Sequence, residues 1–235
     1  MSALDVDAYL YNKDVKCPVC YTAFKINKVR GRKLKIIKKH DDLYVSYKDI
    51  NPIFYSIWVC PGCGYSTTEK EFYEIKKMQI PTIEESIKKN WNKKDYNRER
   101  TAKEAENTYK LAILTGQLLS KPKGYMGELC LKLAWIYRDM ENSKEIEYLQ
   151  NALNFFEDAY QHERLPVATL DELTMTYLIG ELHRQLGNYV KAIHWYNKTL
   201  EHSQIKTKRW MQLKAREQWS KAKVEYDIVK KQKNK

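Results

Sequence analysis

Four of the five cysteines stand in two pairs, Cys17-Pro18-Val19-Cys20 and Cys60-Pro61-Gly62-Cys63. Two residues between the thiols of a pair allow a tight turn that directs both sulfurs toward one point. A glycine after the second pair, Gly64, tolerates the positive φ that such a turn often needs. Two turns that face each other supply four thiolates, a closed tetrahedral set for Zn²⁺. The sequence therefore predicts a structural zinc ion held by Cys17, Cys20, Cys60 and Cys63.

Other uses of these cysteines are open but have less support. A dithiol redox centre belongs in a thioredoxin-like βαβ pattern, which surrounds neither pair. Disulfides need an oxidising compartment, whereas the start of the chain, residues 1–7, lacks the basic and apolar regions of a signal peptide. His40 could replace one ligand, although we expect a solvated turn histidine. Cys130 lies between two leucines on an expected helix, where a lone cysteine is usually a small buried apolar residue.

The segment between the two cysteine pairs has the alternation of β-strands. It is 39 residues long, from Tyr21 to Val59, which exceeds the spacing of a minimal zinc ribbon. Strands are expected near residues 24–26, 34–37, 43–47 and 55–59, and the last leads directly into the second pair. Strands that deliver thiols into turns are the usual construction of a zinc ribbon, so residues 1–80 are predicted to form a zinc-ribbon-like module with a β insert.

Beyond Thr68 the apolar period changes from two to about 3.6. Helices are expected over residues 98–119, 125–139, 144–161, 169–186, 189–202 and 206–229, with short polar connections that favour antiparallel neighbours. Helix starts are expected where Thr precedes Glu by three residues, at Thr68, Thr82 and Thr169. The last helix has apolar residues at a spacing of three and four, which would cap the bundle, and residues 230–235 are expected to be a disordered basic tail.

Residues 176–200 have the pattern of a tetratricopeptide repeat. Gly180 and Ala192 stand where this repeat places small residues, and Tyr196 stands where it places an aromatic residue. Small residues let two antiparallel helices approach closely, and the aromatic ring fills the space beside them. The fold class is thus predicted to be mainly α, with tetratricopeptide-like antiparallel helices over residues 81–229 after the small N-terminal β module.

The combination resembles a bacterial family, domain-of-unknown-function family 2225. The resembling stretches are residues 16–20, residues 51–65 with the second cysteine pair, and residues 180–189, Gly-Glu-Leu-His-Arg-Gln-Leu-Gly-Asn-Tyr. They are distributed over most of the chain up to His202. The resemblance implies a zinc module and helical repeats, and it implies no particular activity.

Repeat proteins usually bind partners through the first helix of each helical pair. On that face we expect Trp135 and Arg138 in one unit, and Tyr177, Glu181 and Arg184 in the next. Arginines beside aromatic rings can hold a carboxylate or an acidic peptide. The alternative is that these side chains pair with each other inside a closed bundle.

No phosphate-binding glycine loop, zinc-protease helix or serine nucleophile motif is present, so we expect a non-enzymatic adaptor that binds a protein or acidic peptide. The chain has a net charge of +12, and residues 203–235 alone have eleven basic and three acidic side chains. Nucleic-acid binding through residues 30–33 and the last helix is the alternative function. Lysine greatly outnumbers arginine, which favours a compositional origin of this charge. We expect no membrane span and a cytoplasmic location.

Overall fold

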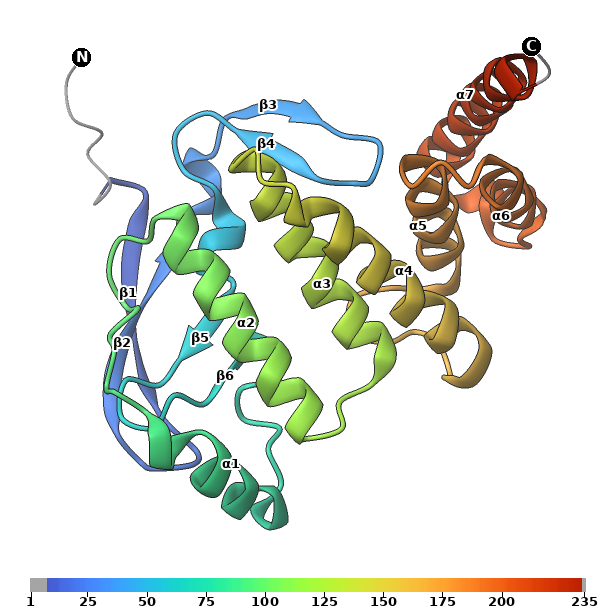
Figure 1. Ribbon diagram of the computed structural model, residues 1–235. Helices are drawn as coiled ribbons and strands as arrows, with labels where there is room; N and C mark the ends of the chain where they lie inside the picture. Colours follow the sequence, from blue (N-terminus) through green and yellow to red (C-terminus); the bar gives the residue numbers. More distant parts are fainter. Residues whose placement is uncertain (1–7, 234–235) are drawn as a thin grey trace. The chain divides into compact units, whose positions relative to one another are not determined.

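The computed structural model describes residues 8–233. It is mainly helical, with three small two-stranded sheets in the N-terminal part of the sequence, as the sequence predicts (Figure 1). The strands are β1 (Leu10–Lys16), β2 (Ala23–Val29), β3 (Ile36–Lys39), β4 (Val45–Tyr47), β5 (Ile57–Val59) and β6 (Ser66–Thr68). The helices are α1 (Ile80–Ser86), α2 (Ala102–Leu118), α3 (Lys123–Asp139), α4 (Lys144–His162), α5 (Glu172–Gln185), α6 (Tyr189–Glu201) and α7 (Arg209–Lys233).

Two compact units divide the chain. The first contains the chain up to Lys38, Val45–Lys121 and Lys132–Glu145, and the second contains Lys39–Tyr44, Pro122–Leu131 and Ile146–Lys235. This division differs from the boundary predicted at residue 80, because α2 packs against β5 and β6 within the first unit. The cysteine-bearing strands therefore share a unit with a long helix instead of forming a separate module.

The first unit places the cysteines in an apolar core. Pairing of β1 with β2 runs from Leu10 opposite Val29 to Lys16 opposite Ala23, and β5 pairs with β6 from Ile57 opposite Thr68 to Val59 opposite Ser66. The two hairpins direct side chains into one buried cluster that includes Ile26, Trp58, Tyr65, Phe72, Ile83 and Leu119. Each hairpin turn contains one cysteine pair, so the core and the candidate site are built by the same strands.

The second unit contains the antiparallel helices α5 and α6. A Cβ atom at Gly180 would lie 3.0 Å from the Tyr196 ring, so the close approach predicted at this glycine is confirmed. The last helix, α7, packs on α5 and α6 through the buried Met211, Ala215 and Ala222, which confirms its capping face. Helix α7 continues to Lys233. The prediction of disorder is therefore wrong for residues 230–233, which are helical. Residues 234–235 lie outside the described part of the chain.

Candidate metal centre

The first cysteine pair lies in the turn between β1 and β2. The Cys17 amide donates to the carbonyl of Thr22 at 3.0 Å, and the Tyr21 amide donates to the carbonyl of Cys17 at 3.0 Å. Closing the turn in this way puts Tyr21 at φ 61°, a left-handed conformation that is unusual outside glycine and asparagine. No glycine follows the first pair, so the residue types do not predict this left-handed conformation.

The second pair lies in the turn between β5 and β6 and repeats the same hydrogen bonds. The Cys60 amide donates to the carbonyl of Tyr65 at 3.0 Å, and the Gly64 amide donates to the carbonyl of Cys60 at 2.8 Å. Here the left-handed residue is Gly64, at φ +75°, as predicted. Two turns of different sequence thus adopt one conformation, in which both sulfurs of a pair lie on the same side.

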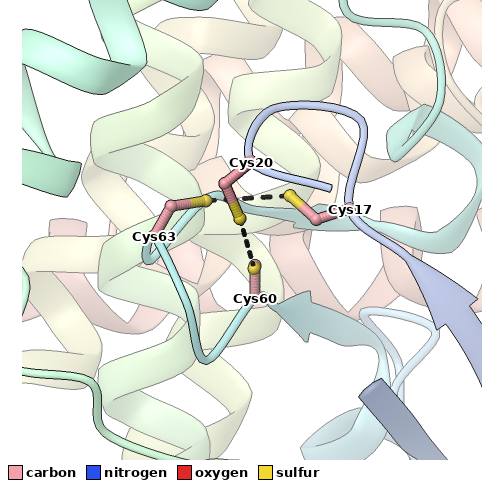
Figure 2. Close-up of side chains that lie close together, drawn as sticks. All are labelled: Cys17, Cys20, Cys60 and Cys63. Carbon is pink, nitrogen blue, oxygen red and sulfur yellow. Dashed lines mark hydrogen bonds between the residues drawn. The ribbon is translucent and has the colours of Figure 1, made fainter. Parts of the chain in front are cut away.

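The four sulfurs meet at one point (Figure 2). The Sγ atoms of Cys17 and Cys63 are 3.7 Å apart, those of Cys20 and Cys60 are 3.5 Å apart, and all four lie within 4.8 Å of one another. Zn–S bonds of about 2.3 Å separate tetrahedral ligands by about 3.8 Å, whereas a disulfide requires about 2.05 Å. All five cysteines are free thiols. The arrangement therefore matches four ligands around one metal ion and does not match two disulfides.

The two turns touch at Gly62. A Cβ atom there would lie 2.4 Å from Oγ1 and 3.1 Å from Cβ of Thr22, and 3.3 Å from Sγ of Cys20. The Thr22 hydroxyl cannot easily move away, because it is 3.2 Å from the Cys20 sulfur, within hydrogen-bonding distance. Only glycine at position 62 lets the second turn approach the first closely enough for the sulfurs to converge.

An indole ring covers the second turn. The Trp91 Nε1 atom donates to the carbonyl of Pro61 at 2.8 Å, and the ring lies so close to Gly64 that a Cβ atom there would be 2.6 Å from it. Ile83 and Ile87 of the α1 region pack in the same buried cluster as the cysteines, and Ile87 also lies beside Gly64. The centre is therefore shielded from water over much of its surface, which strengthens binding between thiolates and a cation.

The thiols influence each other's ionisation. Hydrogen bonds from Cys60 and Cys63 lower the pKa of Cys17 to about 4, so the Cys17 sulfur is readily a thiolate. The hydrogen bond to Cys17 in turn raises the pKa of Cys60 and of Cys63 above the ordinary range. Four adjacent thiolates repel one another unless a cation lies between them. Soft, tetrahedral sulfur ligands are suited to Zn²⁺ or to iron.

The other cysteine and the turn histidine lie outside this centre. Burial raises the pKa of Cys130 to about 12, which makes it an inert thiol, in agreement with the sequence-based interpretation. His40 stacks on the ring of Tyr44, with centroids 5.1 Å apart, and does not belong to the group of potential ligands.

The five predicted partner-binding residues are divided between the two units. In the first unit Trp135 is buried, and the Arg138 Nε atom donates to the Glu145 carboxylate at 2.6 Å. The other three belong to the second unit, and Tyr177 and Glu181 are fully buried there. These two therefore do not line the exposed groove that the sequence predicts.

Internal partners explain this burial. The Tyr177 hydroxyl donates to the carbonyl of Asp41 at 2.6 Å. The Glu181 carboxylate accepts from Arg184 at 2.7 Å and from the Tyr196 hydroxyl at 2.6 Å, and Arg184 also donates to Glu225 at 2.9 Å. Glu181 and Arg184 therefore pair inside the bundle, which is the alternative that the sequence analysis leaves open for them.

Comparisons with known proteins place the chain beside uncharacterised bacterial proteins. A family model described as "Uncharacterized protein conserved in bacteria (DUF2225)" matches residues 10–222. A protein of Borreliella burgdorferi strain B31, named "Uncharacterized protein", is 29% identical over 168 residues, which cover 61% of this chain and 59% of that protein's length. The chain thus spans about six tenths of that relative. No solved structure matches. None of the helices within residues 8–233 combines the length and the apolar character that a bilayer crossing requires.

Proposed function

Because this chain belongs to the bacterial DUF2225 family, whose model matches residues 10–222, we propose a function that combines its cysteine centre with its helices. The chain is a non-enzymatic adaptor. Cys17, Cys20, Cys60 and Cys63 hold a structural Zn²⁺ ion, and the helical surface binds a protein or an acidic peptide. The convergence of four sulfurs, three from buried cysteines and one from the partly buried Cys20, is the observation on which the proposal chiefly rests.

Four thiolates fill every position of a tetrahedral ion, so no position is left for water or substrate. Bound at this point, the ion supplies charge compensation and a cross-link. The chain's own residues do the rest. The two turns direct the sulfurs inward, Thr22 offers its hydroxyl to the Cys20 sulfur at 3.2 Å, and Trp91 covers the second turn. The expected consequence is a centre that stabilises the first unit and performs no catalysis.

Support for the adaptor role comes from where the ionisable groups are used. Glu106 accepts from Tyr137 at 2.9 Å and pairs with Lys103 and Lys110. Arg100 is buried and donates to main-chain carbonyls, including that of Ile57 at 2.8 Å. Such groups hold helices and strands together, which is the arrangement expected of a scaffold.

Isolation of the full-length chain from its bacterial host, with and without nuclease, tests the adaptor role. An adaptor remains associated with one or a few proteins in fixed proportion after nuclease treatment. Loss of all associated material on nuclease treatment would contradict it. So would recovery of the chain alone after cross-linking in the cell.

Nucleic-acid binding is the second candidate, and the exposed residues 30–33 favour it. Arg32 and Lys33 are exposed in the link between β2 and β3, where no acidic residue accompanies them. A filter-binding series with mixed RNA and DNA over increasing salt would then show a steep loss of affinity. Absence of binding at low salt would remove this candidate.

A further inference from the structure

The outward face of α7 is an exposed apolar stripe. Trp210, Leu213, Val224 and Ile228 have exposed fractions of 54%, 55%, 59% and 51%. Their spacing places all four on one side of the helix, away from the buried Met211, Ala215 and Ala222. From Trp210 to Ile228 these side chains span about 27 Å, or five helical turns. They form two apolar pairs, Trp210 with Leu213 and Val224 with Ile228, which the exposed Glu217, Ser220 and Lys221 separate.

A row of positive charge borders the stripe. Arg209, Arg216, Lys223 and Lys230 recur at every seventh residue and are all exposed, so they lie in one row beside the apolar side chains. One exposed acidic residue, Asp227, lies on the same border, so the row is positive in sum. Arg209, Arg216 and Lys230 have no ion-pair partner among residues 8–233. On the other border, Lys214 and Lys221 lie 3.1 Å and 3.4 Å from the Asp41 carboxylate.

These charges argue against a second copy of this chain as the occupant. In an antiparallel pair of α7 helices, rows on the same side meet, so Arg216 of one copy would face Lys223 of the other. In a parallel pair the row of Arg216 would meet the row of Lys214 and Lys221. Both pairings bring like charges together. The occupant must have negative charge where this helix has positive charge.

A lipid surface fits less well than a helix. Glu217 is exposed and lies in the apolar row between Trp210 and Val224, since each is seven residues from it. At an anionic membrane this carboxylate would meet the acyl boundary and negative headgroups. A partner helix can instead place one lysine or arginine opposite Glu217. Both the apolar stripe and its polar centre are then satisfied.

We propose that the outward face of α7 binds an acidic amphipathic helix of another protein. The partner has apolar residues on one face, Glu or Asp along both borders and one basic residue near the centre. This inference rests on the proposed adaptor function and identifies its surface as Trp210, Leu213, Val224 and Ile228 with the bordering row. The predicted residues Tyr177 and Glu181, which are buried, have no part in it.

A synthetic peptide of about three heptads, with Leu in the seam, Glu on both borders and one central Lys, is the probe. Fluorescence anisotropy with the full-length chain measures its affinity. Arg216→Glu/Lys223→Glu should weaken binding at least tenfold, and a peptide with Lys on its borders should bind that variant better than it binds the wild type. Leu213→Ser/Val224→Ser should also weaken binding at least tenfold. Lys191→Glu/Lys206→Glu, an equal charge change at exposed positions off the stripe, should leave it unchanged.

Unaltered binding in the charge-reversed or serine variants would overturn the inference, as would no binding to wild type. Sedimentation of the chain with phosphatidylglycerol vesicles, without peptide binding, would assign the face to lipid. A dimer that Leu213→Ser/Val224→Ser dissociates would assign it to a second copy. Circular dichroism checks that each variant is folded. If the chain has protein partners in the cell but does not bind this peptide, the proposed role of the α7 surface is refuted and the proposed adaptor function is not.

Discussion

Substitution of Gly62 by alanine tests whether the two cysteine turns must touch for the metal centre to form. The added Cβ would lie 2.4 Å from Thr22 Oγ1 and 3.1 Å from Thr22 Cβ. To avoid this overlap the hydroxyl must rotate, which gives up its 3.2 Å contact with Cys20 Sγ, or the turns must separate. Overpacking of this kind costs about 1–3 kcal/mol. If the cost falls on the metal-bound state, affinity drops about 5- to 150-fold.

The assay is competition for zinc with a chromogenic chelator, together with thermal unfolding of the metal-loaded protein. Gly31→Ala is the matched control, because a Cβ atom at Gly31 meets nothing within 4 Å and its φ is not positive. We expect Gly62→Ala to release zinc at lower chelator concentration and to unfold at lower temperature, while Gly31→Ala behaves like the wild type. Equal affinity and stability in the two variants would refute the requirement for contact at Gly62.

Three further predictions concern the second unit. Arg184→Ala should lower the free energy of unfolding in urea by about 3 kcal/mol, because it leaves the buried Glu181 carboxylate without its cation. Arg138→Ala removes a more exposed ion pair and should lower it by about 1 kcal/mol or less. Equal effects of the two substitutions would contradict the internal role of Arg184. Gln218→Met should raise stability by about 1 kcal/mol, because the buried Gln218 carboxamide has no protein partner among residues 8–233, and a lower unfolding midpoint would contradict this. Cys130 should react with iodoacetamide at pH 8 only after unfolding, because burial raises its pKa to about 12; rapid labelling of the native chain would show that the thiol is accessible.

The helices could be placed closely from periodicity alone. A helix is predicted over residues 144–161, and α4 extends over Lys144–His162. The two agree because the apolar residues of this segment recur on one face, which the structure buries. The helix starts were harder to predict. Thr82 lies inside α1, and α5 is capped by Asp171, whose side chain accepts from the Thr174 amide at 2.8 Å. A Thr-x-x-Glu motif is a local signal, and it forms a cap only where the preceding chain can turn away.

A reciprocal capping box lies at Thr101, where no helix start is predicted from the sequence. The Glu104 amide donates to the Thr101 hydroxyl at 3.2 Å, and the Thr101 amide donates to the Glu104 carboxylate at 3.1 Å. The motif was present in the sequence with the same spacing as at Thr82. The predicted start at residue 98 placed Thr101 within the helix, so its role was missed.

The metal ligands could be predicted because thiol spacing is a local property. Their surroundings could not, since Trp91 meets Pro61 from 30 residues away and Gly62 meets Thr22 from 40 residues away. The proposed partner face had the same difficulty. The Tyr177 hydroxyl bonds to the carbonyl of Asp41, 136 residues earlier, and no periodicity within a helix reports such a contact. A side chain that helix periodicity predicts to be exposed can therefore be buried when a segment distant in the sequence packs against it.

Metal content of the purified full-length chain tests the central claim most directly. Elemental analysis after purification without chelators should give one zinc per chain. The Cys60→Ser and Cys20→Ser variants should hold less, and Cys130→Ser should hold as much as the wild type. Removal of zinc should expose four rapidly reacting thiols and unfold the first unit. A folded chain that contains no metal, contains iron instead, or has disulfides among these cysteines would contradict the structural zinc centre.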